Sequence, residues 1–182
     1  MKCISKSIVV VFFLLSLNVV AQETFPKSWE GYYKGELQIF GVDSVQMKLE
    51  MKLDILQKSD SIYQWKITYD FKGKEDIRDY ELLLVDKTKG IYKIDKKNTI
   101  VIDSYYKTEI FTSFFEVMDS FIISTYTKEN KDIIFEIIAA DGKTPASTGN
   151  SKFKDEDIPE VKSYLVNSRQ KAILKKYQLP SN

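Results

Sequence analysis

The chain has 182 residues, with 27 Lys or Arg against 26 Asp or Glu, no histidine and a single cysteine, Cys3. A charge balance this close to neutral, with both signs interspersed, argues against a dedicated nucleic-acid surface. Without histidine, and with no cysteine after position 3, the chain lacks the ligands of the usual zinc and copper sites and the residues of Ser-His-Asp or Cys-His catalysis.

Residues 1–21 have the form of a secretory signal peptide. Two lysines precede an apolar stretch from Ile8 to Leu17, and small residues precede a predicted cut between Ala21 and Gln22. A transmembrane anchor would need roughly 20 apolar residues, and this stretch is shorter. Removing the leader takes away Cys3 and two lysines, which leaves 25 basic against 26 acidic residues and a net charge near −1.

The predicted mature protein therefore has no thiol and no disulfide, and its single domain, residues 22–182, must rely on its core. A lipoprotein signal would place a cysteine at the cleavage point, so we expect no lipid anchor. No second apolar run of spanning length follows the leader. The Lys-, Ile- and Phe-rich composition and the cleavage junction resemble those of small exported proteins of Gram-negative bacteria. We expect a periplasmic or extracellular location.

The stretch from Ser44 to Gln57 gives the clearest structural signal. Odd positions from Val45 to Ile55 are apolar, and the even positions between them are polar or charged. This alternation predicts an extended strand with one apolar and one wet face. The strand is long, and long strands with one apolar face favour a closed sheet, because an open sheet would leave long unpaired edges.

Further alternating segments, joined by short polar turns, occupy most of the chain before residue 141. Strands at this regular spacing are typical of an antiparallel meander. The other predicted strands are residues 29–39, 63–71, 78–85, 91–94, 99–106, 109–118, 121–127 and 132–140.

A loop and then a terminal helix are predicted after the meander. Residues 141–154 are rich in Gly, Pro, Ser, Thr and Asn and favour a loop. Acidic residues at 155–157 and Pro159 are typical of a helix start, and apolar or small residues follow at spacings of three and four from Ile158 to Ala172. The predicted fold is thus an all-β, up-and-down antiparallel β-barrel of about 8–10 strands with one C-terminal α-helix over residues 157–178.

The sequence Trp-Glu-Gly-Tyr-Tyr-Lys-Gly at 29–35, the consecutive meander and the predicted helix after the barrel resemble the calycins, in particular the lipocalins. The resemblance is one of architecture and covers most of residues 29–178. It implies a cup that binds a small molecule as the default role, although a fold alone does not fix a function.

The candidate ligand-binding residues come from the strands and share aromatic or charged character. Arg78, one of only two arginines after the leader, lies on the same strand face as Tyr80 and Leu82, which we interpret as the inner face. An inward arginine in an apolar cup needs an acidic partner or an anionic ligand; a position at the rim near Asp76 is the alternative. The candidates are Trp65, Arg78, Tyr80, Tyr106, Glu116 and Tyr126.

The leading hypothesis is a non-enzymatic protein that holds a small hydrophobic or amphipathic molecule, with no cofactor. A structural or interaction module of the cell envelope, with a protein partner, is the first alternative. A carboxylate-dependent hydrolase or lyase is the second. A calcium site near Asp95 and Asp103 lacks the ligand spacing of a calcium loop, so no metal site is predicted. The carboxylates that could serve the second alternative are Asp79, Glu81, Glu109, Glu116 and Glu136.

Overall fold

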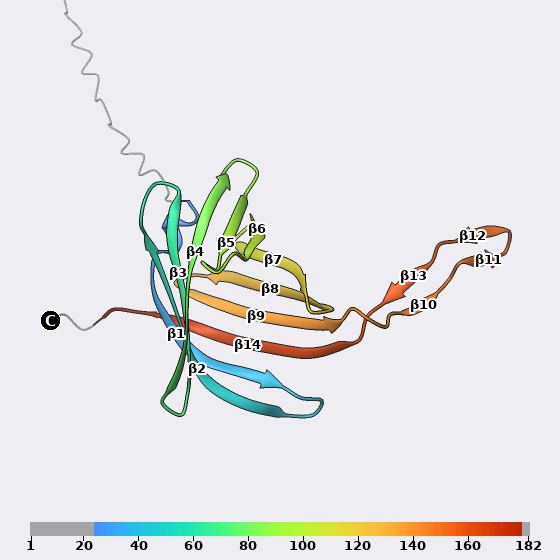
Figure 1. Ribbon diagram of the computed structural model, residues 1–182, viewed down its shortest axis with the longest axis horizontal. Coiled ribbons are helices and arrows are strands. Elements are labelled where there is room, and N and C mark those ends of the chain that lie inside the picture. The colour runs from blue at the N-terminus through green and yellow to red at the C-terminus, as the bar shows by residue number, and fades with distance from the viewer. Residues whose placement is uncertain (1–23, 180–182) are drawn as a thin grey trace, which may run out of the picture.

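The computed structural model describes residues 24–179, and within them a closed antiparallel barrel of ten strands forms the body of the protein (Figure 1). The predicted leader lies outside the described residues. The barrel strands are β1 (Gly31–Phe40), β2 (Val45–Gln57), β3 (Ile62–Phe71), β4 (Lys74–Asp86), β5 (Ile91–Asp95), β6 (Val101–Lys107), β7 (Ile110–Val117), β8 (Ser120–Glu129), β9 (Asp132–Asp141) and β14 (Val166–Tyr177).

Strands β1 to β8 each pair with the next strand in sequence, and β14 closes the barrel between β9 and β1. On β14, Ala172 lies opposite Leu37 of β1 on one side and opposite Phe135 of β9 on the other. The register with β9 shifts between Val166 and Ser168, near the start of β14. The meander expected from the sequence is therefore confirmed. Within residues 24–179, no helix is long and apolar enough to span a membrane.

The alternation in β2 matches its burial. Met51, Leu53 and Ile55 are fully buried, whereas the residues between them remain partly exposed. Toward the start of the strand the inward side chains become accessible, and Met47 is 42% exposed. The same strand thus runs from a packed end of the barrel to an open end.

The predicted C-terminal helix is wrong: residues 157–178 contain no helix, and most of them form β14. Burial in this segment alternates with a period of two residues: Ala172 and Leu174 are buried, and Ile173 between them is half-exposed. The apparent helical spacing combines residues of separate elements, because Ile158 and Val161 lie in β12 and β13 and Ala172 lies in β14. A strand here pairs with both β1 and β9, which would otherwise be open edges, and this pairing outweighs local helix signals.

A long two-stranded arm connects β9 to β14 and projects away from the barrel (Figure 1). The loop predicted over residues 141–154 is largely the outgoing half of this arm. The arm comprises two short ladders, in which β10 (Ala146–Thr148) pairs with β13 (Val161–Ser163) and β11 (Ser151–Phe153) pairs with β12 (Glu156–Ile158).

The packed end of the barrel is closed by the chain segment before β1. A 3-10 turn, η1 (Lys27–Trp29), follows Phe25, and both Phe25 and Trp29 are buried. The ring of Phe25 stacks on Tyr106 with centroids 4.3 Å apart and meets Trp29 edge-on at 4.8 Å. Tyr92 and Phe111 complete the cluster. Edge-on and stacked aromatic pairs at these spacings add stability beyond their burial.

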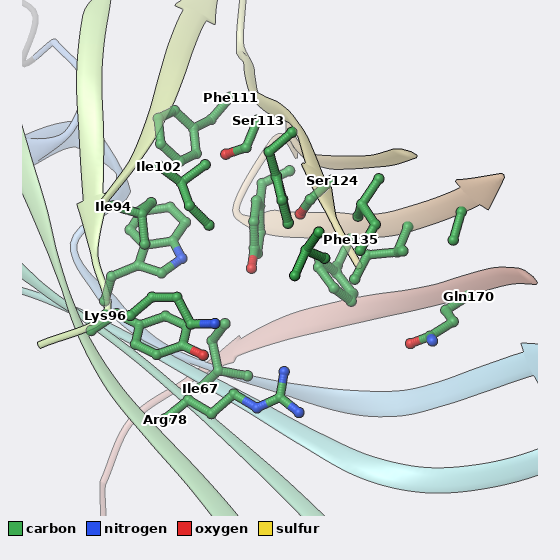
Figure 2. Close-up of a pocket in the computed structure, with 18 of the residues that line it drawn as sticks. Ile67, Arg78, Ile94, Lys96, Ile102, Phe111, Ser113, Ser124, Phe135 and Gln170 are labelled. Carbon is green, nitrogen blue, oxygen red and sulfur yellow. The ribbon is translucent and has the colours of Figure 1, made fainter. Parts of the chain in front are cut away.

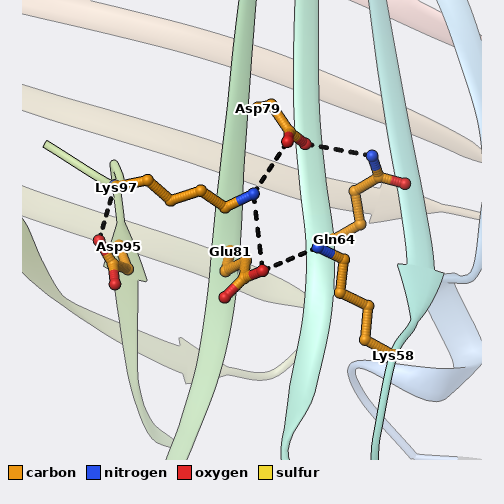
Figure 3. A network of polar contacts seen from close by, with 6 residues as sticks. All are labelled: Lys58, Gln64, Asp79, Glu81, Asp95 and Lys97. Carbon is orange, nitrogen blue, oxygen red and sulfur yellow. Dashed lines mark hydrogen bonds and ion pairs between the residues drawn. The ribbon is translucent and has the colours of Figure 1, made fainter.

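The outer face carries the charges that alternate with the core residues, and Figure 3 shows one such network across β3, β4 and the turn after β5. The ammonium of Lys97 lies 2.8 Å from Asp79 and 3.5 Å from Glu81, and Lys58 lies 2.7 Å from Glu81. Hydrogen bonds from these lysines lower the pKa of both carboxyl groups. Exposed pairs of this kind contribute about 0–1 kcal/mol each, so the network chiefly fixes which face of β4 meets water.

Candidate ligand-binding cavity

The open half of the barrel contains a cavity of about 320 Å³, lined by inward-facing side chains of β3 to β9 and β14 (Figure 2). Its size falls at the lower end of the ~300–1,000 Å³ typical of small-molecule sites. Val117 lines the cavity and is 43% exposed, and Ser124, which also faces inward, is partly exposed. Water can therefore reach the interior.

The floor of the cavity is aromatic and tightly packed. Trp65 contacts Phe111 with ring centroids 5.1 Å apart and meets Tyr126 edge-on at the same distance. Phe135 lies against Tyr126 at 4.9 Å. All four side chains are buried, and burial strongly raises the pKa of Tyr126. The floor thus offers a rigid apolar wall with a neutral hydroxyl within it.

A row of serine hydroxyls crosses the inner wall on three consecutive strands. Ser104 on β6 pairs with Ser113 on β7, which pairs with Ser124 on β8. The hydroxyl oxygens of Ser104 and Ser113 are 2.7 Å apart and share a hydrogen bond, and Ser104 is fully buried. Ser113 and Ser124 both line the cavity. The row gives an otherwise apolar wall a narrow polar stripe.

Two cations line the cavity, Arg78 on β4 and Lys96 just after β5. The guanidinium of Arg78 lies 4.7 Å from the ring centre of Tyr69, and it donates to Asp76 from Nε and from a terminal nitrogen, at 3.2 and 3.0 Å. The ammonium of Lys96 lies 5.7 Å from the ring centre of Tyr80. Burial raises the pKa of Tyr69 to about 12, so its hydroxyl is neutral at physiological pH.

A second hollow of about 420 Å³ adjoins the first and shares Tyr69, Arg78, Ile137 and Gln170 with it. It lies between the open ends of β1 to β4 and brings in Leu37 and Leu49. Arg78 therefore stands at the boundary between two parts of one open barrel interior. Figure 2 shows its side chain extending toward the side of the cavity where Gln170 lies.

Of the six predicted ligand-binding residues, the structure gathers Trp65, Arg78, Tyr80 and Tyr126 around the cavity. Tyr106 faces inward but belongs to the packed end, where its hydroxyl donates to Glu109 over 3.0 Å. The side chain of Glu116 points away from the cavity, on the opposite face of β7 from its lining neighbours, and it is exposed. Whether the four gathered residues hold a ligand remains a prediction.

Sequence reasoning did not single out Lys96, Ser113 or Ser124. The serines could have been found by extending the inward parity of Phe111 along β7 and of Tyr126 along β8. Lys96 follows the end of β5 but keeps the inward parity of Ile94. The sequence does not distinguish it from Lys93 and Lys97, two nearby lysines that face outward.

The candidate carboxylates do not converge. Asp79 and Glu81 are in the outer network, and Glu136 is paired outside the barrel with Arg169 at 3.3 Å and Lys171 at 3.4 Å. Glu109 accepts from Trp29 and Tyr106 at the packed end. Among the described residues that line the cavity there is no aspartate or glutamate. Nor does any group of three or more potential metal-ligating side chains occur within residues 24–179.

Fold and site together define the class of protein: a closed ten-stranded antiparallel barrel with one packed end, one open end and a cavity that opens to solvent. No protein-family model matches the sequence, and no curated protein resembles it significantly. The architecture is compatible with that of the calycins.

Proposed function

We propose that this is an exported, non-enzymatic binding protein that holds a small hydrophobic or amphipathic molecule in its barrel interior. The observation that carries the proposal is the open cavity of about 320 Å³, whose wall combines buried aromatic rings with a few hydroxyls. Few, well-placed polar groups in an apolar concavity are the general signature of small-molecule sites.

The lipocalin-like relationship belongs to the same proposal. It is supported by the closed order of consecutive strands and by Trp29, which is buried at the packed end just before β1. Two features differ from the lipocalin pattern. The barrel has ten strands in the described residues, where lipocalins have eight, and Trp29 precedes Gly31, where lipocalins have the reverse order.

A titration with the neutral fluorophore phenylnaphthylamine tests the function, because its emission rises in apolar surroundings. Ser124→Phe should fill the cavity and abolish the emission rise. Thr125→Phe provides a matched control, since Thr125 is adjacent in β8 but faces away from the cavity. Equal binding by both variants, or no binding by the wild type, would contradict the proposal.

Export has its own test. Expressed with its leader in a Gram-negative host, the chain should be recovered from the periplasm or medium with Gln22 as its first residue. Recovery from the cytoplasm at full length would contradict this part of the proposal.

The arm favours a second candidate function, an interaction module of the cell envelope. Its apolar side chains are uncovered: Phe153 is 62% exposed and Leu165 is 71% exposed. Isolated two-stranded ribbons are marginally stable in water, so a protein partner that covers the ribbon would stabilise it. If this is its role, replacing residues 143–164 by a tight Asn-Gly turn should abolish capture of an envelope partner and leave phenylnaphthylamine binding unchanged. Unchanged capture by the shortened variant would exclude it.

A further inference from the structure

The charge of the cavity wall is one-sided. Its lining includes Arg78 and Lys96 but, within the described residues, no carboxylate. A cation facing an apolar space is costly unless an anion or hydrogen-bond acceptors accompany it. The wall of this cavity therefore carries two cations, and the carboxylate of Asp76, which pairs with Arg78, lines the adjoining hollow.

Lys96 is the clearer of the two cations. It is half-buried, and among residues 24–179 no carboxylate lies within ion-pair distance of its ammonium. The lysines around it behave differently, because Lys93 pairs with Asp103 at 3.3 Å and Lys97 pairs with Asp79 at 2.8 Å. Those two face outward. Within the described part of the chain, the ammonium of this inward lysine lies over the ring of Tyr80.

Arg78 does have a partner, but a replaceable one. Asp76 is two residues away on the same strand and its side chain is 61% exposed, and Arg78 itself is 45% exposed. Exposed pairs of this kind contribute little to stability. Asp76 engages Nε and one terminal nitrogen, whereas a guanidinium has five N–H donors. The fork of Arg78 can thus accept a further anion, and it is held in place by stacking on Tyr69.

We propose that the ligand is an organic anion, with an apolar body in the cavity and its acidic group between Arg78 and Lys96. The inference rests on the proposed function and adds the ligand's chemical class. Both side chains extend into the same region of the cavity in Figure 2. The many rings of the wall favour a compact, ring-containing body, because aromatic surfaces pack well against one another.

Two related fluorophores test the assignment. Anilinonaphthalene sulfonate carries a sulfonate on the skeleton of phenylnaphthylamine, which is neutral. The wild type should bind the sulfonate at least about fivefold more tightly, since charge-assisted hydrogen bonds are the strong ones. Arg78→Met and Lys96→Met should each weaken sulfonate binding about fivefold or more, and by a larger factor than they change the binding of neutral phenylnaphthylamine.

Asp76→Asn should change the affinity for the sulfonate in the opposite direction. It removes the carboxylate that competes for Arg78, so sulfonate binding should tighten. Lys93→Met is the matched control, because it removes one positive charge from the outer face of β5; sulfonate binding should stay within about twofold of the wild type.

The outcomes separate the two proposals. If both fluorophores bind equally well and the Arg78 and Lys96 variants change neither affinity, the anion site is wrong and the apolar cavity stands. If neither fluorophore binds the wild type, the proposed function fails, and the anion site fails with it. Weaker sulfonate binding by Asp76→Asn would also overturn the anion site. Should Arg78→Met not fold, Lys96→Met and Asp76→Asn still decide the question.

Discussion

The ammonium group of Lys128 on β8 donates a hydrogen bond to the hydroxyl of Tyr33 on β1, over 2.9 Å and across the packed end of the barrel. The Tyr33 hydroxyl in turn donates to the carbonyl of Trp29 over 2.7 Å. Lys128 also lies 4.7 Å from the ring centre of Tyr33 and 6.0 Å from that of Trp29. These two hydrogen bonds thereby connect the segment before β1 to β8, which is three strands from β1 in the order of the barrel.

This arrangement predicts a rise in stability between pH 8 and pH 10. Burial, and then the charge of Lys176, lowers the pKa of Lys128 from 10.5 to about 8. In this window the unfolded chain keeps the proton that the folded chain has lost, so the free energy of unfolding increases with pH. Lys128→Met, which keeps the aliphatic contacts, should remove the rise.

Urea denaturation at pH 8, 9 and 10 measures this, with Lys131→Met as the control because Lys131 is exposed. A wild type with equal stability at all three pH values would show that Lys128 is not desolvated as the structure indicates.

Above pH 10 the free energy of unfolding should instead fall as the pH rises. Burial raises the pKa of Tyr92 from 10.0 to about 12, and Tyr33 and Tyr106 are raised to the same value with burial as the main cause. Between these values the folded chain holds protons that the unfolded chain has released, so stability falls as pH rises. Tyr92→Phe should make the fall measurably shallower between pH 10 and pH 12. An unchanged slope in urea denaturation would contradict the burial of this hydroxyl.

Gly35 on β1 allows β14 to approach closely where the barrel closes. A Cβ at this position would lie 2.1 Å from the carbonyl oxygen of Ile173, and backbone cannot rotate aside as a side chain can. Gly35→Ala should therefore destabilise the barrel by about 1–3 kcal/mol, the usual range for overpacking.

Gly41→Ala is the matched control, since the atoms nearest to a Cβ there belong to the flexible side chain of Gln46 and not to backbone. Thermal unfolding of both variants gives the comparison. A Gly35→Ala variant as stable as the Gly41→Ala variant would mean that β1 and β14 are not in close contact at this seam.

The barrel was predictable because its signal is repeated and local. Alternation along β2 follows from one buried face, and the same pattern returns in β3. The prediction of a terminal helix was wrong because long-range pairing decides the structure of this segment. Whether residues near Ala172 form a helix or a strand depends on the open edges of β1 and β9, which are distant in sequence.

The site was predictable only in part. Arg78 and Tyr80 share the parity of buried Leu82, so their direction follows from β4 alone. Tyr106 faces inward like the cavity residues, but it is covered by Phe25 from the segment before β1, and the parity of its strand does not show this contact. Depth along the barrel depends on such long-range packing, and it decides which inward residues surround a cavity and which form the core.

The most direct measurement of the central claim is nuclear magnetic resonance of isoleucine methyl groups with bound phenylnaphthylamine. Ile122 lines the cavity, whereas Ile123, the next residue in β8, is 40% exposed on the outer face; Ile137 and Ile138 in β9 form a second such pair. We predict nuclear Overhauser effects from the ligand's ring protons to Ile122 and Ile137 and none to Ile123 and Ile138. Effects at the outer pair, or at neither pair, would contradict binding inside the barrel.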